Sequence, residues 1–147
     1  MRDPRILDSV SELEREAAAF VEELRPSENK ATLVTLSGDL GAGKTSFTQA
    51  AARALGVTDA VTSPTFVLAK SYALPSSSAF KTLMHIDAYR LSEGKDLGTL
   101  RFTDSMREPG TLVMLEWPEM VEDGLPPADV RIRLEVRDTD SRSISYA

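Results

Sequence analysis

Apolar residues recur along the chain with two different periods. Over residues 9–25 they recur at helical spacing, and Ser9 with Glu12 forms the pattern of a capping box, so this segment predicts an amphipathic helix. A second helix is predicted over residues 44–55, where Gly56 directly follows the last apolar position. Elsewhere the apolar runs are short and lack the helical period, which is typical of strands.

Runs rich in apolar and β-branched residues predict strands over residues 31–36, 66–74, 81–87, 111–115, 131–136 and 143–146. A short turn of Pro-Ser-Ser-Ser joins 66–74 to 81–87 and favours an antiparallel hairpin. The polar, glycine-containing segment 92–98 predicts a mobile loop and a candidate lid, followed by a short helical piece at 100–107. Parallel neighbouring strands are joined by long crossovers that are usually helical. Because the sequence predicts so few helices, a wholly parallel sheet is excluded. We expect an α/β fold with a mixed sheet, parallel at its centre and antiparallel in the hairpin and at the C-terminus, with few flanking helices.

Composition narrows the class of protein. The chain has 147 residues, 41% hydrophobic and 27% charged, which is typical of one folded domain over residues 1–147. Its 17 Lys and Arg against 23 Asp and Glu give a net charge of −6, which disfavours an autonomous nucleic-acid binder. Cysteine is absent, which excludes disulfides and a cysteine nucleophile. Without a signal peptide or a membrane-spanning run, we expect a cytoplasmic protein with no membrane partner.

A glycine-rich loop lies between the strand at 31–36 and the helix at 44–55. It matches the P-loop pattern G-x-x-x-x-G-K-[ST] with the residues Gly38-Asp39-Leu40-Gly41-Ala42-Gly43-Lys44-Thr45. Glycines let successive backbone N–H groups turn inward around an anion, and the following helix adds its positive N-terminal end. Lys44 is expected to reach the β- and γ-phosphates, and the Thr45 hydroxyl to ligate Mg²⁺. The loop therefore predicts a nucleotide site.

Two predicted strands end in a carboxylate. Asp87 is the last residue of the segment 81–87, and Glu116 directly follows the run 111–115. Carboxylates in these places come to the same edge of a sheet as the loop. We expect Asp87 to hold Mg²⁺ through water, and Glu116 to orient or deprotonate the attacking water. The two roles could be exchanged, and either residue alone could simply end a strand.

Several other positions allow two interpretations each. Thr65 follows the second predicted helix, where it either senses the γ-phosphate as a switch residue or forms an ordinary Pro-Thr turn. His85 is the only histidine and lies inside an apolar strand, which favours packing over catalysis. Trp117 either stacks at the nucleotide site or closes the core. Arg131 and Arg133 form a basic strand face that is either solvated or a docking surface.

Four segments together resemble one known family. They are the P-loop, Ser63-Pro64-Thr65-Phe66, His85-Ile86-Asp87-Ala88-Tyr89-Arg90-Leu91 and Glu116-Trp117-Pro118-Glu119. Their order and spacing resemble the TsaE family, also called YjeE, the ATPases of tRNA threonylcarbamoyladenosine biosynthesis. The resemblance covers nearly the whole chain from about Ser9 onward, and its last two motifs are far more specific than the P-loop. It also implies a short first strand over residues 5–8.

The resemblance implies a small P-loop NTPase domain acting as a bacterial ATPase with ATP and Mg²⁺ as cofactors. In the family, such a subunit binds the TsaB–TsaD complex, and its ATP hydrolysis is thought to reset that complex between turnovers, so tRNA is contacted indirectly through partners. By position, the resemblance assigns catalysis to Glu116, Lys44 and Thr65, and the metal to Thr45, Asp87 and Glu116. The expected nucleotide contacts are Asp39, Leu40, Gly41, Ala42, Gly43, Lys44, Thr45, Ser46 and Trp117.

Two alternative functions are also compatible with a P-loop of this sequence. A small-molecule kinase has a similar P-loop, but it must bind an acceptor and close an Arg-bearing lid that excludes water. Beyond residues 92–107, the chain offers little for either task, and it has few helices. A nucleotide-sensing module that never turns over is the third possibility. A phosphorylated acceptor product would favour the kinase.

Overall fold

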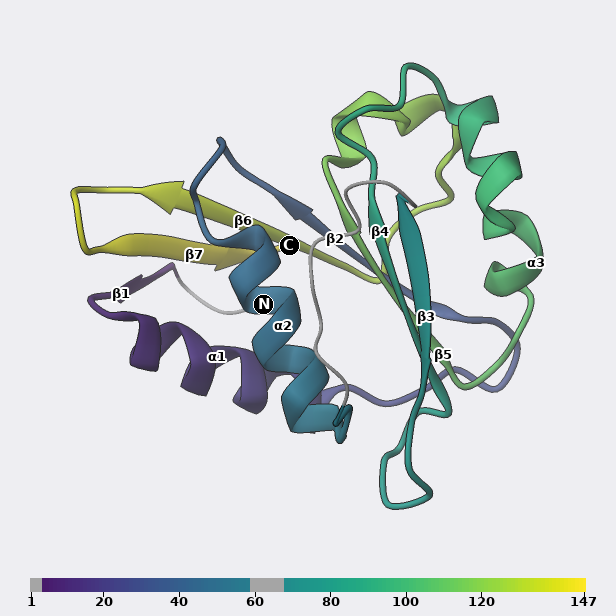
Figure 1. Ribbon diagram of the computed structural model, residues 1–147, viewed down its shortest axis with the longest axis horizontal. Coiled ribbons are helices and arrows are strands. Elements are labelled where there is room, and N and C mark those ends of the chain that lie inside the picture. Colours follow the sequence, from purple (N-terminus) through teal and green to yellow (C-terminus); the bar gives the residue numbers. More distant parts are fainter. Residues whose placement is uncertain (1–3, 59–67) are drawn as a thin grey trace.

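The computed structural model describes residues 4–58 and 68–147, and within these residues the chain forms a seven-stranded sheet with helices on both faces (Figure 1). The strands are β1 (Arg5–Leu7), β2 (Thr32–Ser37), β3 (Ala69–Ala73), β4 (Thr82–Asp87), β5 (Thr111–Glu116), β6 (Val130–Val136) and β7 (Arg142–Tyr146). The helices are α1 (Val10–Glu23), α2 (Lys44–Leu55) and α3 (Phe102–Met106), with 3₁₀ helices η1 (Gly94–Leu100), η2 (Pro118–Met120) and η3 (Glu122–Gly124).

The sheet is mixed, as the shortage of helices predicts. Its strand order is β1-β7-β6-β2-β5-β4-β3. The four central strands are parallel, because β2 pairs in parallel with both β5 and β6, and β4 pairs in parallel with β5. Antiparallel pairs flank this centre: β3 with β4, β7 with β6 and β1 with β7. The expected fold class is confirmed, including the hairpin and the short first strand.

Alternate side chains of the central strands enter two separate cores. On β2, Val34 and Leu36 pack toward α1 and α2, whereas Leu33 points to the opposite face. That opposite face is covered by α3 and the 3₁₀ helices, so the molecule has three layers (Figure 1). Strands covered on both faces are apolar throughout, which explains why the β5 run shows no alternation.

The helix boundaries follow the predicted caps. Ser9 is the N-cap of α1, and its hydroxyl accepts a hydrogen bond from Glu12 N–H at 3.1 Å. Gly56 ends α2 in the left-handed conformation with φ 103°. Strand β3 begins at Ala69 among the described residues, and the start of the run predicted at 66–74 lies outside them. No helix in the described ranges is long and apolar enough to cross a membrane.

The segment expected to be a mobile loop is instead a 3₁₀ helix, η1, held against η3. Gly94 N–H donates to Asp123 Oδ1 at 2.7 Å, and a Cβ on Gly94 would lie 2.2 Å from Gly124 N. The prediction of a loop over residues 92–98 was wrong because Gly94 serves a close approach of two backbones, which a sequence pattern cannot distinguish from a flexible turn. This contact holds η1 against η3 in the layer that covers the core on the α3 face of the sheet.

We expect Gly94→Ala to destabilise the fold by about 1–3 kcal/mol, because the added methyl group meets backbone atoms that cannot rotate away. Gly98→Ala is the matched control within the same helix, since nothing lies within 4 Å of a Cβ there. Urea unfolding of the two variants measures the difference. Equal stability of the two variants would contradict the close-approach explanation.

Candidate functional site

The P-loop connects β2 to α2, and its glycines adopt conformations that other residues avoid. Gly38, Gly41 and Gly43 have φ values of 143°, 80° and 104°. A Cβ on Gly38 would also lie 2.2 Å from the carbonyl oxygen of Leu134 on β6. The loop therefore depends on glycine both for its turns and for its close approach to the neighbouring strand.

Lys44 is folded back over its own loop. Its ammonium donates hydrogen bonds to the carbonyl oxygens of Gly38 and Asp39, the second at 2.9 Å, and Nζ lies 3.9 Å from the ring centroid of Trp117. Burial lowers the pKa of Lys44, while nearby carboxylates, with Glu116 foremost, oppose that shift. The result is a buried cation held by carbonyls, an aromatic face and acidic neighbours.

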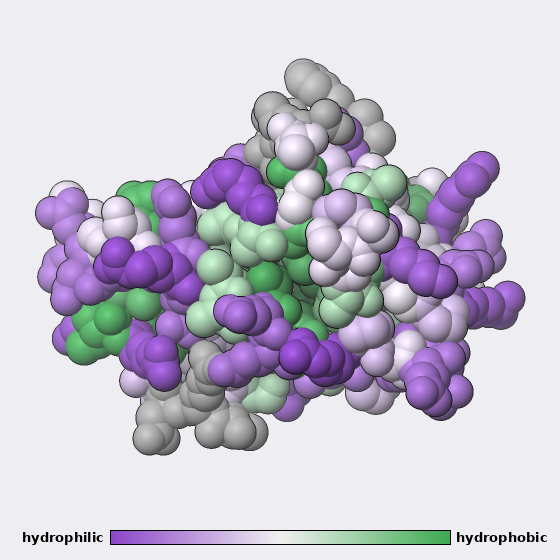
Figure 2. Space-filling view, turned by 90° about the horizontal axis from the view of Figure 1, so that it is seen from below, coloured by the Kyte–Doolittle hydropathy of each residue, from purple (hydrophilic) through white to green (hydrophobic). Residues whose placement is uncertain are grey.

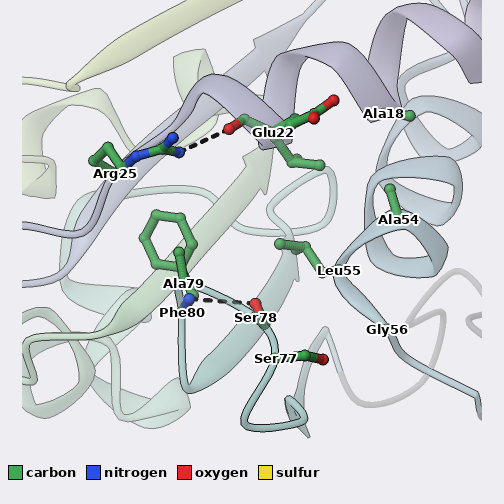
Figure 3. Close-up of a pocket in the computed structure, with 11 residues that line it drawn as sticks. Ala18, Glu22, Arg25, Ala54, Leu55, Gly56, Ser77, Ser78, Ala79 and Phe80 are labelled. Atoms are coloured by element: carbon green, nitrogen blue, oxygen red, sulfur yellow. Dashed lines mark hydrogen bonds between the residues drawn. The ribbon is translucent and has the colours of Figure 1, made fainter.

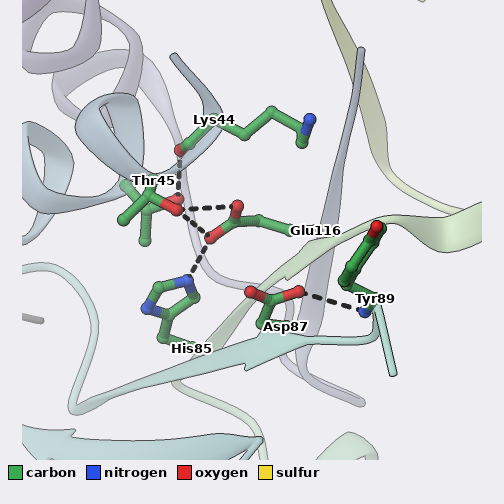
Figure 4. A network of polar contacts seen from close by, with 7 residues as sticks. Lys44, Thr45, His85, Asp87, Tyr89 and Glu116 are labelled. Atoms are coloured by element: carbon green, nitrogen blue, oxygen red, sulfur yellow. Dashed lines mark hydrogen bonds and ion pairs between the residues drawn. The ribbon is translucent and has the colours of Figure 1, made fainter. Parts of the chain in front are cut away.

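The carboxylates expected at the strand ends lie at the same edge as the loop. Asp87 and Glu116 are register partners on the parallel strands β4 and β5, and Glu116 is also the register partner of Leu36 on β2. Glu116 is only 2% exposed, and its two oxygens accept the Thr45 hydroxyl at 2.9 and 3.1 Å (Figure 4). The parallel register thus joins the P-loop helix to the end of β5.

Asp87 has a more open environment than Glu116. Its Oδ1 accepts a hydrogen bond from Tyr89 N–H at 3.0 Å, and the side chain lines the same cavity as Lys44 and Thr45. Burial raises the pKa of Asp87 above its ordinary value, and the charge of Glu116 adds to this effect, although the bond from Tyr89 opposes it.

His85 belongs to this site, which the packing interpretation did not foresee. It is completely buried, and its Nε2 lies 2.6 Å from Oε2 of Glu116 (Figure 4). A signal for this placement is present in the sequence, because His85 lies two residues before Asp87 and so faces the same side of β4. The identity of its partner depends on the β4–β5 pairing and could not be predicted.

Aromatic rings form the wall beside the loop. The rings of Tyr89 and Trp117 lie 4.9 Å apart between centroids at 50°, and both residues line a cavity of about 330 Å³ with Lys44 and Thr45. Trp117 adopts the left-handed conformation with φ 61°, and its backbone N–H donates to the carbonyl of Leu36 at 3.1 Å. Trp117 thus lines the cavity and also packs against the core on that face of the sheet, while its stacking on a nucleotide stays a prediction.

A second hollow of about 410 Å³ lies on the other side of the P-loop. It shares Gly41 and Gly43 with the first cavity, and Ser46 is also common to both. Its remaining walls come from the start of α1 and the β6–β7 turn, with the residues Asp8, Ser9, Val10, Leu13, Thr139, Asp140 and Arg142. Arg142 donates to the carbonyl of Gly41 at 3.1 Å, a contact that sequence analysis did not anticipate.

The structure brings most of the predicted residues together. A single cavity is lined by Leu40, Gly41, Ala42, Gly43, Lys44, Thr45, Ser46, Asp87, Tyr89, Glu116 and Trp117. Asp39 lies in the same loop and accepts from Lys44 through its carbonyl. Thr65 falls outside the described residues. Arg133 is exposed and pairs with Glu135 at 2.6 Å.

A further hollow, of about 570 Å³, lies at the opposite end of α2 from the P-loop. It is bounded by the last turns of α1 and α2 and by the β3–β4 turn, including Arg25, Gly56, Ser78 and Phe80 (Figure 3). Seen from below, the molecule shows hydrophobic surface in its middle with hydrophilic side chains around it (Figure 2). The predicted chemical groups lie elsewhere, so size alone does not identify the functional site.

We expect Asp87→Asn to raise the melting temperature of the ligand-free protein at pH 7. Because the folded state raises the pKa of this carboxyl, ionised Asp87 destabilises the fold, and this penalty disappears as the pH falls toward the ordinary pKa. The gain from Asn should therefore narrow on acidification, as followed by thermal unfolding. The exposed Asp140→Asn is the control. A gain that is independent of pH would contradict the assignment.

Comparisons with known proteins identify the family of this chain. A family model described as "Threonylcarbamoyl adenosine biosynthesis protein TsaE" matches residues 8–144. A Bacillus subtilis protein named tRNA threonylcarbamoyladenosine biosynthesis protein TsaE is 36% identical over 115 residues, covering 78% of this chain and 68% of that protein. The Rickettsia felis protein of the same name is 33% identical over 141 residues, covering 95% and 77%.

A solved structure is also similar over nearly the whole chain. The crystal structure of Bacillus subtilis YdiB superposes with a TM-score of 0.75 at 28% identity, covering 98% of this chain and 83% of that one. The fold is therefore that of a small P-loop NTPase-like domain. Given the family match across residues 8–144, the chain belongs to the TsaE family of tRNA threonylcarbamoyladenosine biosynthesis.

Proposed function

We propose that this protein binds ATP with Mg²⁺ and hydrolyses it in support of threonylcarbamoyladenosine formation in tRNA, as an accessory subunit of a TsaB–TsaD complex. The observation that carries the proposal is the contact between Thr45 of the P-loop helix and Glu116 at the end of β5. It joins the hydroxyl and the carboxylate in the cavity that also contains Lys44. A Gly-rich turn with only a structural role would not need this contact.

The loop supplies the phosphate-binding groups. Its glycines turn the backbone around the position of an anion, and the 12-residue helix α2 points its N-terminal end at the same place. The ammonium of Lys44 is already held at the loop by two carbonyls. We infer that it exchanges these neutral acceptors for the β- and γ-phosphate oxygens, which form stronger charge-assisted hydrogen bonds.

Thr45 and Glu116 would hold Mg²⁺. Both offer oxygen ligands, and Mg²⁺ is usually bound by one or two carboxylates together with substrate phosphates. The Thr45 hydroxyl can direct a lone pair to the ion while its hydrogen still donates to Glu116, so the observed contact is compatible with ligation. When bound, the ion neutralises the negative charge that develops on the transferred phosphoryl group.

Asp87 is then the residue best suited to the attacking water. It lies beside Glu116 in the strand register, and its raised pKa makes it a better proton acceptor at neutral pH than an ordinary carboxylate. This assignment exchanges the roles expected for Asp87 and Glu116. Thr65 remains a predicted switch residue.

The second hollow is where the nucleoside would lie. A triphosphate whose terminal end is at Lys44 leaves the loop past Gly41, Gly43 and Ser46, the residues that line both cavities. Val10 and Leu13 offer an apolar surface there, and the β6–β7 turn offers polar groups. We infer that adenosine occupies this space between the start of α1 and the β6–β7 turn.

The relatives support the cellular role. Their names place them in tRNA threonylcarbamoyladenosine biosynthesis, while a net charge of −6 makes this chain a poor binder of tRNA on its own. A division of labour follows, in which TsaB and TsaD hold the tRNA and this subunit supplies ATP hydrolysis. Arg131 and Arg133 lie on the exposed side of β6, where a partner could dock.

We expect Lys44→Ala to reduce ATP hydrolysis at least about 100-fold, because it removes the charge that stabilises the transferred phosphoryl group. Glu116→Gln should cause a similar loss through the metal. Release of inorganic phosphate from ATP measures both effects. Lys95→Ala is the matched control, since its side chain is 82% exposed and lies outside the cavity. A phosphorylated acceptor as the product would instead identify a kinase.

We expect the ATPase to be slow in isolation and faster when purified TsaB and TsaD are added, because the proposed role links hydrolysis to resetting their complex. The steady-state rate with and without these partners is the measurement. Lys44→Ala mixed with the same partners controls for contaminating activity. Equal rates under the two conditions would disprove activation by partners while leaving intrinsic hydrolysis intact.

A further inference from the structure

His85 is a buried polar residue that the proposed chemistry does not yet use. It lies on β4, between Met84 and Ile86, and has no measurable exposure. Its neighbours along the strand enter the opposite core, whereas His85 faces the layer that contains α2. Within that layer it approaches Glu116, so the carboxylate is contacted from two elements, by Thr45 of α2 and by His85 of β4 (Figure 4).

The hydrogen-bond geometry assigns the proton of the ring. A carboxylate has only acceptor sites, so the 2.6 Å contact between Nε2 and Oε2 of Glu116 requires Nε2 to carry a hydrogen and donate it. The other ring nitrogen, Nδ1, is buried without a hydrogen-bond partner in the part of the chain that the structure describes. The ring therefore makes one strong hydrogen bond to the carboxylate, while its other nitrogen has no hydrogen-bond partner among residues 4–58 and 68–147.

A histidine that only filled space in the core would lower the stability of the fold in this arrangement. A buried nitrogen without a partner destabilises the fold, and an apolar side chain of similar size would avoid that cost. The hydrogen bond to Glu116 is the interaction that compensates for this cost, and the ring also interacts electrostatically with Asp87. The Thr45 hydroxyl alone supplies one hydrogen to both carboxylate oxygens, whereas a second donor from β4 fixes Oε2 separately and limits rotation about the side-chain torsions of Glu116.

We propose that His85 is a positioning residue that orients Glu116 for Mg²⁺ binding at Thr45. The inference rests on the proposed function, because it assumes that Thr45 and Glu116 hold the ion. His85 itself touches neither phosphate nor metal. It donates from Nε2 to Oε2 and so holds the carboxylate where Oε1 meets the Thr45 hydroxyl. Outer residues that orient a metal ligand typically contribute about 10- to 100-fold to metal affinity or activity.

The protonation of the ring can be tested directly, because His85 is the only histidine in the chain. In tag-free, ¹⁵N-labelled wild-type protein, long-range ¹H–¹⁵N spectra of the imidazole should show Nε2 bearing a proton. Glu116→Gln replaces the acceptor and should shift this resonance. A spectrum in which Nε2 carries no proton would overturn the proposal, whatever the activity of the protein.

The effect of His85 on Mg²⁺ binding can be measured by calorimetry of ADP binding, once in EDTA and once in excess Mg²⁺. We expect His85→Leu to lose about 10- to 100-fold of the Mg²⁺-dependent gain in ADP affinity while affinity in EDTA stays at the wild-type value. His85→Gln retains an N–H donor on its side chain and should recover much of the gain. A merely structural role would lower both affinities together, and Gln would then not rescue the metal-dependent part.

The double variant His85→Leu/Glu116→Gln shows whether His85 affects Mg²⁺ binding through Glu116 or independently of it. If His85 acts through Glu116, adding His85→Leu to Glu116→Gln should cause no further loss of the Mg²⁺-dependent gain. Additive losses, or a wild-type gain in His85→Leu, would overturn the inference alone. If the wild-type protein showed no Mg²⁺-dependent gain, the proposed function itself would fail, and the metal role of His85 would fail with it.

Discussion

The bond between Thr45 and Glu116 connects the two parts of the molecule on which the site depends. Thr45 lies in the first turn of α2, and Glu116 ends β5, 71 residues later in the chain. The contact requires β2 and β5 to be parallel neighbours with Leu36 opposite Glu116, because only that register brings the loop after β2 and the carboxylate to one edge. Asp87 follows from the same constraint, one strand further along.

Keeping these groups away from water imposes a cost on the fold. Lys44 is 5% exposed and Glu116 is 2% exposed, so each ionised group must find partners inside the protein. The carbonyls of the loop, the Trp117 ring, the Thr45 hydroxyl and the His85 ring supply them. Low local dielectric makes these contacts stronger than they would be in water, and it also makes a missing partner more harmful. Stability and ligand binding therefore depend on the same buried network.

Helices cover both faces of the sheet that carries this edge. On one face, α1 packs against α2, and the P-loop lies between the start of α2 and the β6–β7 turn, where Arg142 donates to the loop. On the other face, the contact between Gly94 and Gly124 holds the 3₁₀ helices over the second core. The P-loop thus lies between two cavities, one lined by Lys44, Asp87 and Glu116 and the other bounded by the start of α1 and the β6–β7 turn.

The sequence by itself determined much of this protein: the mixed α/β fold, the caps at Ser9 and Gly56, the P-loop, and the two carboxylates at strand ends. These features depend on local chemistry or on a fixed period of side chains, which can be read without knowing what lies nearby. Only the tertiary structure decided the partner of His85. A periodic pattern shows which face of a strand is buried, but it does not show which residue of another strand lies opposite.

Tertiary contacts also decided the roles of Gly94 and Arg142. Gly94 looks like a loop residue until the backbone of η3 is placed against it, and nothing in the local pattern around Arg142 shows that its guanidinium meets the carbonyl of Gly41. Both contacts join residues far apart in the chain, and their energies depend on distances that only the folded molecule defines. The local sequence pattern thus determined which chemical groups the protein has at its P-loop and strand ends. Long-range packing decided which of these groups contact one another.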